Sequence, residues 1–325
     1  MVKRLGGALV FAAAVVACGS SSSRSGFEEG QDPTLGGGAD NAGNAGGLGQ
    51  PAGENPRADE CQKMDLVFVV DDSGSMKEEQ DNLAANFPKF VKVLDDFRTK
   101  SGAKIDYRVA VTTTGRDLRY TIQTPIGAIA QNEKGDNGAF REKASCGSTR
   151  RWLERGDGDV AKNFACLSKV GTGGASIEMP LYALKLALED RVTDGTNAGF
   201  RRPDALLGVV ILSDEDDCSR EDNDFTVASD SCDTMPNLRS IDDYAGVLDN
   251  AAGGPGRWAA AVIAGESSCE SSFGKAIEAK RLKKFTQRAG KNGTFSSICD
   301  GDLAPGLQKA LDTFDAACKN FPGPR

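Results

Sequence analysis

The chain has 325 residues, of which 39% are hydrophobic and 26% are charged, so it can form a globular domain with a sizeable core. Its net charge of −8 argues against nucleic acid as a partner and against electrostatic attachment to anionic lipid. Because the chain has no histidine and no CxxC spacing, a zinc site is not expected either.

The first residues have the pattern of an export signal. Lys3 and Arg4 precede an uncharged stretch, Leu5 to Ala17, which is too short to span a bilayer but fits the apolar core of a secretory signal. The small residues directly before Cys18 resemble the lipobox of bacterial lipoproteins. This resemblance implies a signal peptide over residues 1–17 and lipidation of Cys18. The alternative is an ordinary signal peptide that contains a cysteine.

Residues 18–60 are rich in Gly, Ser and Asn and have almost no large apolar side chain. Such a segment cannot bury enough surface to offset its chain entropy, so we expect a disordered tether. A Gly-rich coil of this length would reach on the order of 35 Å. We therefore expect the chain to be held at the cell envelope by its lipid, with the outer membrane favoured by analogy with other lipoproteins.

From residue 61 onward, buried strands alternate with amphipathic helices. The expected strands cover residues 65–70, 105–114, 205–213, 258–265 and 293–299. The expected helices cover residues 77–97, 176–192, 240–252, 274–290 and 303–318. Pro88 is expected to bend or split the first helix. Residues from about 115 to 170 lack strong periodicity and are interpreted as an edge strand plus an insertion held by a disulfide.

Strands separated by helices predict a mostly parallel sheet with helices on both faces. The expected fold is therefore a doubly wound α/β domain over residues 61–325. Apart from Cys18 the chain has an even number of cysteines, which in an exported protein indicates a disulfide framework. Sequence alone does not determine how they pair. Our expected pairing joins neighbours and the two ends of the domain: Cys146–Cys166, Cys218–Cys232, Cys269–Cys299 and Cys61–Cys318.

Oxygen-bearing side chains follow two of the predicted strands. Asp71, Ser73 and Ser75 follow the first strand with the spacing D-x-S-x-S, and Asp214 follows the strand at 205–213. In a parallel sheet, ligands sit beyond the carboxyl ends of the strands, so these side chains are expected at one edge. Ligation by oxygen alone favours Mg²⁺, Ca²⁺ or Mn²⁺.

This arrangement resembles a von Willebrand factor A (VWA) domain with its metal-ion-dependent adhesion site. The resemblance covers roughly residues 61–318 and is carried mainly by "DDSGSM", with support from "ILSD" and "LYALKLAL". It implies a Rossmann-like VWA fold. It also implies that Ser73 and Ser75 contact the metal directly, while Asp71 and Asp214 act through water.

Members of that family commonly add a threonine ligand from a third loop, here "VGTGGAS". In this chain Ala175 stands where that threonine is usually found, and alanine has no side-chain oxygen. Thr172, three residues earlier, is therefore our first choice for the ligand, and Ser176 is the second. Mg²⁺ is the favoured ion, ahead of Ca²⁺ and Mn²⁺. Because hydroxyls neutralise the ion poorly, it can still bind an Asp or Glu carboxylate of a protein partner. We therefore expect a protein of adhesion or envelope assembly, not an enzyme.

Several alternatives remain. Asp and Ser after a strand are common helix N-caps, and the chain can also be a structural envelope scaffold with a vestigial metal site. A metal-dependent hydrolase is a third alternative. However, the chain has no histidine as a general base, and Ser73 stands where aspartate-nucleophile phosphatases need a second aspartate. The acidic run at 214–225 has two interpretations, a solvated loop or a calcium loop, and the first is favoured.

Overall fold

The computed structural model describes residues 61–99, 102–271 and 274–322. The expected signal peptide over 1–17, the tether over 18–60 and the lipidated Cys18 lie outside these residues. No helix in the part of the chain that is described is long and apolar enough to cross a membrane.

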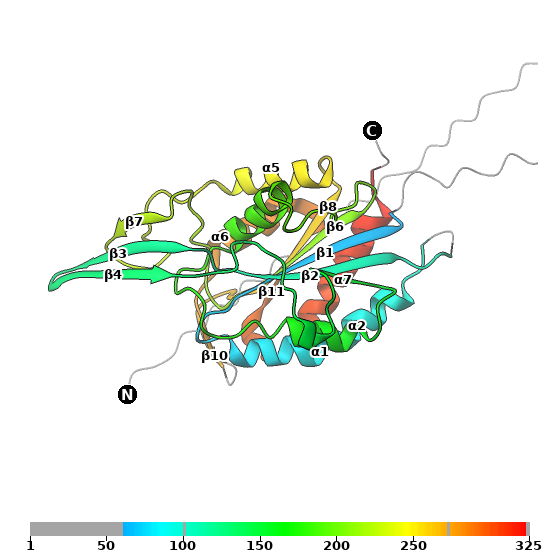
Figure 1. The fold of residues 1–325 in the computed structure, drawn as a ribbon, viewed down its shortest axis with the longest axis horizontal. Helices are drawn as coiled ribbons and strands as arrows, with labels where there is room; N and C mark the ends of the chain where they lie inside the picture. Colours follow the sequence, from blue (N-terminus) through cyan, green and yellow to red (C-terminus); the bar gives the residue numbers. More distant parts are fainter. Residues whose placement is uncertain (1–60, 100–101, 272–273, 323–325) are drawn as a thin grey trace, which may run out of the picture. The chain divides into compact units, whose positions relative to one another are not determined.

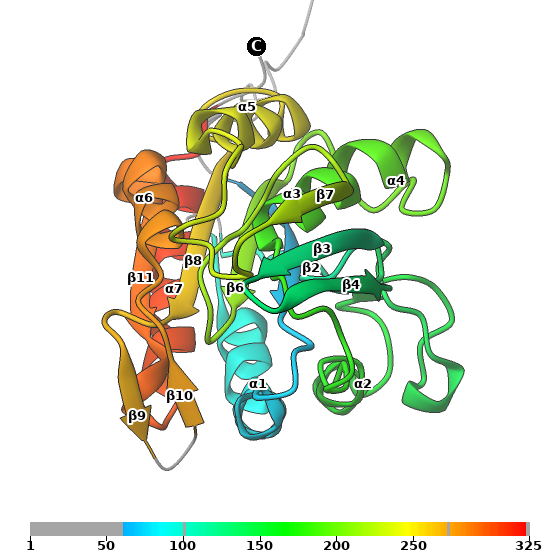
Figure 2. The ribbon, with the colours of Figure 1, turned by 90° about the vertical axis from the view of Figure 1, so that its left-hand side faces the viewer.

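The centre of the domain is a six-stranded sheet, seen in Figures 1 and 2. Its strands are β1 (Lys63–Val70), β2 (Asp106–Thr113), β5 (Leu153–Glu154), β6 (Leu206–Leu212), β8 (Trp258–Ala264) and β11 (Gly293–Ser297). They lie in the order β11-β8-β6-β1-β2-β5, and only β5 pairs in the antiparallel direction. The predicted α/β class with a mostly parallel sheet is confirmed.

Helices pack on both faces of this sheet. The α-helices are α1 (Lys77–Asp96), α2 (Val160–Leu167), α3 (Pro180–Lys185), α4 (Arg191–Thr193), α5 (Ile241–Ala252), α6 (Lys280–Ala289) and α7 (Ala304–Lys319). A π-helical turn, η2 (Leu186–Asp190), joins α3 to α4, and the 3-10 turns are η1 (Ala144–Cys146), η3 (Gly290–Asn292) and η4 (Ile298–Asp300). Figure 1 shows α5 and α6 on one side of the sheet and α1 and α2 on the other.

Strand β1 supplies both hydrophobic cores because successive side chains of a strand point to opposite faces. Phe68 belongs to the core that contains α1, α2 and α7, whereas Val67 and Val69 belong to the core that contains α3, α5 and α6. The ring of Phe68 lies 5.6 Å from that of Phe87 in α1 and 4.8 Å from that of Phe164 in α2, between ring centroids. This burial on two faces makes β1 the central element of the domain.

Helix α1 runs without a break through Pro88, so of the two expected effects, a bend or a split, the split is wrong. Proline removes one backbone donor from the helix ladder. The side chains on either side of it, Phe87 and Phe90, are buried and stack with their ring centroids 5.2 Å apart. Tertiary packing of these rings therefore outweighs the local cost of the proline.

The predicted helix at 176–192 begins later than expected. Residues 176–179 are not helical, and the helix starts at Pro180, which is well suited to the first turn because its missing N–H needs no partner there. The preceding residues are held outside the helix by a hydrogen bond from the Met179 N–H to the Thr114 carbonyl, 3.3 Å long. The segment 176–179 is thus part of the loop at the carboxyl edge of the sheet.

The insertion is more regular than its sequence suggests. β3 (Leu118–Thr124) and β4 (Gly127–Glu133) form an antiparallel hairpin, and β7 (Asp224–Val227) pairs in parallel with β3. Figure 2 shows this second sheet facing the viewer. The sequence predicts one edge strand in this region, and β5 lies at the edge of the central sheet. It does not predict the hairpin, because almost all of β4 is exposed and shows no apolar periodicity.

The predicted helix at 274–290 is wrong over its first residues. β10 (Gly274–Ala276) pairs instead with β9 (Cys269–Ser271), and the helix begins only at Lys280. The Ile277 N–H donates to the carbonyl of Asp214 over 2.9 Å, and the Ala279 N–H donates to that of Gly265 over the same distance. These contacts with the chain beyond β6 and β8 take the backbone donors away from a helix.

Four disulfides join the described residues, and they are the four expected pairs: Cys61–Cys318, Cys146–Cys166, Cys218–Cys232 and Cys269–Cys299. Cys146–Cys166 ties η1 of the insertion to α2. Cys61–Cys318 ties the residue before β1 to the last turn of α7, where the Cys61 N–H also donates to the carbonyl of Cys318 over 3.0 Å. Disulfides of this number are typical of proteins that fold outside a reducing cytosol.

The two longest-range bridges should stabilise the domain to different degrees. Cys61–Cys318 spans 257 residues and Cys269–Cys299 spans 30, so the chain entropy that each removes from the unfolded state differs by about 2 kcal/mol. We expect the double variant Cys61→Ala/Cys318→Ala to lose more unfolding free energy in urea than the control Cys269→Ala/Cys299→Ala. Equal losses would contradict this ranking.

Candidate metal-binding site

The candidate site is built where β1 and β6 end side by side. In their parallel register Val70 lies opposite Leu212, and the Asp71 N–H donates to the carbonyl of Leu212 over 3.0 Å. The D-x-S-x-S loop and the loop that begins with Ser213 and Asp214 therefore leave the sheet as neighbours. The sheet topology brings together these two predicted parts of the site.

Two hydrogen bonds fix the carboxylate of Asp71, which is fully buried. Its Oδ1 accepts from the Ser73 N–H over 2.8 Å, and its Oδ2 accepts from the Ser213 hydroxyl over 2.6 Å. The hydroxyl oxygens of Ser73 and Ser75 lie 3.3 Å apart. Hydroxyl and carboxylate oxygens are the ligand types that small divalent cations take in proteins.

Asp214 adds a second carboxylate, which has a side-chain hydrogen bond with Ser75 but one oxygen that lacks a partner. The side chain is 3% exposed, and its Oδ1 is buried without a hydrogen-bond partner among the described residues. A buried carboxylate oxygen without a partner is costly unless it neutralises a positive charge or becomes protonated. This orphaned oxygen, together with the all-oxygen donor set, fits a divalent cation.

Burial raises the pKa of three acids at or near this site. It raises the pKa of Asp71 to about 7; the nearby carboxylate of Asp214 adds to the rise, whereas the hydrogen bonds from Ser213 and Ser73 oppose it. Burial likewise raises the pKa of Asp214, and that of Glu79 in α1 to about 7. The site therefore gathers acids that have no compensating positive charge close by.

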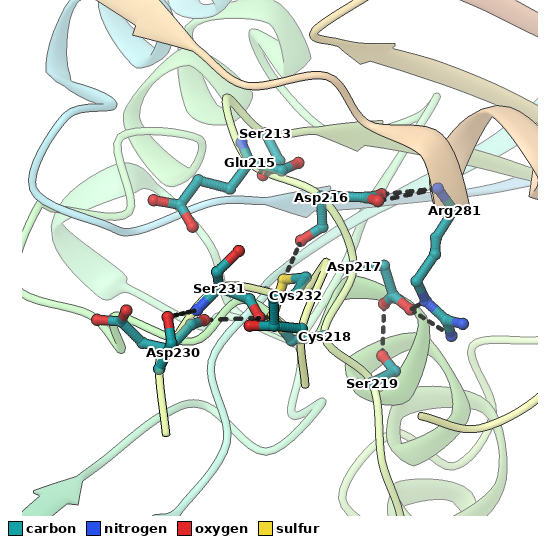
Figure 3. Close-up of a disulfide and its surroundings, with 12 residues drawn as sticks. Ser213, Glu215, Asp216, Asp217, Cys218, Ser219, Asp230, Ser231, Cys232 and Arg281 are labelled. Carbon is teal, nitrogen blue, oxygen red and sulfur yellow. Dashed lines mark hydrogen bonds and ion pairs between the residues drawn. A yellow bond between two sulfur atoms is a disulfide. The ribbon is translucent and has the colours of Figure 1, made fainter. Parts of the chain in front are cut away.

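A pocket of about 430 Å³ opens beside the two serines. Ser73 and Ser75 line one part of it, and Glu215 and Asp230 line another. Figure 3 shows these two acids beside the Cys218–Cys232 disulfide, which closes the loop that carries Asp230. Of the four candidate ligands, Ser73 and Ser75 line this pocket, whereas Asp71 and Asp214 do not.

The Gly-rich turn brings only one of the two predicted hydroxyl residues to this pocket. Ser176 lines it, and the Ser176 N–H donates to the carboxylate of Glu133 at the end of β4 over 3.0 Å. Thr172 is exposed and is not one of the residues that line the pocket. The geometry thus favours the second choice, Ser176, over the first.

Side chains that sequence reasoning missed hold the loops in place. The Nε2 of Gln80 donates to the carbonyls of Asp71 and Gly171 over 2.9 and 2.7 Å, so α1 connects the first and third loops. The Gly174 N–H donates to the carbonyl of Asp72 over 2.8 Å. A Cβ on Gly174 would lie 2.2 Å from the Asp72 carboxyl carbon, so a larger residue here would require the Asp72 side chain to move.

Two of these residues could have been found from the sequence, and one could not. Asp72 and Ser213 adjoin predicted ligands, so a search of the neighbouring positions would have found them. Gln80 carries no local signal, because its two contacts depend on where α1 lies relative to the turn at Gly171.

The acidic run at 214–225 is not a solvated loop in its first half, so that prediction is wrong there. Asp216 and Asp217 are buried. Asp216 accepts from the backbone N–H groups of Arg281 and Leu282 at the start of α6, and Asp217 pairs with the Arg281 guanidinium at 3.0 Å, as Figure 3 shows for the Arg281 contacts. These two acids anchor α6 and are already satisfied by protein donors.

Acidic side chains alone do not make a metal cage here. Within residues 61–99, 102–271 and 274–322, no three Asp, Glu or Cys side chains are grouped closely enough to hold an ion. A cation at this edge would have to use the serine hydroxyls together with the carboxylates.

The raised pKa of Asp71 predicts how stability changes with pH in the presence of EDTA. The folded-state pKa of about 7 lies above the unfolded value of about 3.9, so this contribution to stability is fully present below the unfolded value and is lost as pH rises through about 7. We expect the urea midpoint of the EDTA-treated domain to fall between pH 5 and pH 8. Asp71→Asn should show a smaller fall, and an equal fall in both proteins would contradict the assignment.

No model of a known protein family matches the sequence, and no curated protein matches it. Solved structures with some similarity include proximal thread matrix protein 1 from the mussel byssus, which is 14% identical with a TM-score of 0.40 over 79% of this chain and 49% of that one. Pilus adhesin SpaC from Lactobacillus rhamnosus GG is 11% identical with a TM-score of 0.42, over 79% and 31%.

Manganese-loaded TRAP protein from Plasmodium vivax is 14% identical with a TM-score of 0.33, over 78% and 74%. This chain spans about half of the mussel protein and about a third of the pilus adhesin. Similarities of this strength support no conclusion about what the chain does.

Proposed function

We propose that residues 61–325 form a Rossmann-like VWA-type domain that captures a protein partner through a divalent cation, with Mg²⁺ as the first choice of ion. The ion would be held by Asp71, Ser73, Ser75 and Asp214. The observation that carries the proposal is the orphaned, buried carboxylate oxygen of Asp214 at the loop that adjoins two closely spaced serine hydroxyls.

The two serines and Asp71 would contribute differently to binding of the ion. Ser73 and Ser75 supply neutral oxygens, so they hold an ion without cancelling its charge. Asp71 is oriented by its two hydrogen bonds and supplies negative charge without having to rearrange. When bound, the ion supplies a positive centre to which an Asp or Glu carboxylate of the partner can be attached.

The pocket has the oxygen-rich lining that a cation-binding site needs. Its lining in the described residues consists of hydroxyls, carboxylates, small residues, Ile277 and the half-cystine Cys232. Hydroxyl and carboxylate oxygens are the ligands that Mg²⁺ and Ca²⁺ take in proteins. We therefore propose a role in adhesion or envelope assembly, with the partner's acidic residue as the hot spot of the interface.

We propose further that the domain is exported and tethered at the cell envelope, on the outer membrane, through lipidated Cys18. The four disulfides support export, and the composition of residues 18–60 supports a flexible tether.

The metal site can be tested without the partner. Ser75→Ala removes one proposed ligand from an exposed position, so we expect the affinity for Mg²⁺ in isothermal titration calorimetry to fall about tenfold or more. Ser231→Ala is the matched control, because Ser231 lines the same pocket but is not a proposed ligand. A wild-type domain that gives no heat with Mg²⁺, Ca²⁺ or Mn²⁺ would favour the structural scaffold.

Partner capture should depend on the same ligands. Asp71→Ala and EDTA are each expected to abolish recovery of a specific envelope protein in a pull-down, while circular dichroism shows that the domain remains folded. Capture that persists in a folded, metal-free domain would refute the proposed mode of binding.

The tether is tested separately. In the native host, the mature N-terminus is expected to be an acylated Cys18 by mass spectrometry, and Cys18→Ser should release the protein from the membrane fraction. An unmodified mature N-terminus at another residue would contradict the lipid anchor.

A further inference from the structure

The third loop of the site has no threonine placed to bind the proposed ion. Thr172 is exposed and does not line the pocket, and Ala175 has no side-chain oxygen. Ser176 is the one hydroxyl residue of this loop that lines the pocket, and its side chain is exposed. Two residues further along the chain, just before α3, lies Glu178.

Glu178 has no partner for its charge in the described residues. It is 0% exposed, it lines the pocket together with Ser73 and Ser75, and among the described residues neither of its oxygens accepts a hydrogen bond from an N–H or a hydroxyl group. Its carbonyl accepts from the Cys218 N–H over 2.8 Å, so its main chain is held firmly. A fully buried carboxylate without a donor would be strongly destabilising unless a cation or a proton compensates it.

Among the described residues, the charged groups that act most strongly on Glu178 are acidic, so they do not compensate the charge of its carboxylate. These groups are the carboxyls of Asp71 and Glu215, which carry the same sign of charge, and Glu215 can share a hydrogen bond with Glu178 only while one of the two is protonated. The nearby acids Asp216 and Asp217 differ, because Arg281 compensates them. Among the acids of this sheet edge, Glu178 thus combines full burial, two unsatisfied oxygens and a place in the pocket.

We infer that Glu178 is the ligand that the third loop contributes to the cation, in the place where the resemblance led us to expect a threonine. This inference rests on the proposed metal site. Because acidic side chains alone are too far apart to hold an ion, Glu178 would turn about its side-chain bonds and act together with the serine hydroxyls. A third carboxylate would bind the ion more tightly and, through its capacity for bidentate contact, would favour Ca²⁺ more than a serine- and threonine-rich site does.

The inference is tested by titrating CaCl₂ and MgCl₂ into wild-type protein and three variants. Glu178→Gln keeps the size of the side chain and removes the ligand charge, so Ca²⁺ affinity should fall at least about tenfold, as expected for a lost ligand. Thr172→Ala should leave the affinity within about twofold of wild type. Unchanged affinity in Glu178→Gln, or a tenfold loss in Thr172→Ala, would overturn the assignment.

Glu79→Gln is the matched control for charge alone. Glu79 is also buried, has one unsatisfied carboxylate oxygen and feels the charge of Asp214, but it does not line the pocket. It should weaken Ca²⁺ binding by no more than about threefold, in the range of an indirect charge effect. Equal losses of Ca²⁺ affinity in Glu79→Gln and Glu178→Gln would show that Glu178 acts only through its negative charge and is not a ligand.

A count of water molecules on the ion separates ligation from a structural role. With Eu³⁺ as the probe, luminescence lifetimes in H₂O and D₂O should show at least one additional bound water in Glu178→Gln, and none in Glu79→Gln. If wild type binds no metal, the proposed site itself fails. If Ser75→Ala weakens binding while Glu178→Gln changes neither affinity nor water count, only the role of Glu178 fails.

Discussion

The parallel pairing of β1 with β6 is the constraint on which the rest of the candidate site depends. It brings Asp71 and Ser213 to adjacent positions at the carboxyl edge of the sheet, and the Ser213 hydroxyl then orients the Asp71 carboxylate. The two cores that cover β1 hold this pairing rigidly, because its side chains are buried on both faces. A one-residue slip of β1 would exchange the faces of its side chains and move the D-x-S-x-S loop.

The site accumulates negative charge where water is largely excluded. Asp71, Asp214 and Glu178 are all buried, and burial raises the pKa of each carboxyl. Such an arrangement opposes folding unless a cation or a proton compensates it. The apolar burial on both faces of the sheet and the bridge between Cys61 and Cys318 stabilise the domain from outside the site.

Neighbouring acids in one short run play different parts. Asp216 and Asp217 accept hydrogen bonds from the start of α6 and from Arg281, and so they connect that helix to the sheet edge. Asp214, two residues earlier, has an oxygen with no such donor. The difference arises from the position of α6, which is distant in sequence, so composition alone could not separate an anchoring acid from a candidate ligand.

The sequence by itself determined the α/β class, the order of the main strands and helices, and the two loops that carry Asp71 and Asp214, because apolar periodicity is local and parallel strands end at a common edge. Only the tertiary structure decided that the β3–β4 hairpin forms a second sheet, that Thr172 does not line the pocket and that Glu178 lines it without an N–H or hydroxyl donor among the described residues. The direction of a loop side chain depends on contacts such as those of Gln80 with Gly171, which join residues far apart in the chain and leave no local pattern.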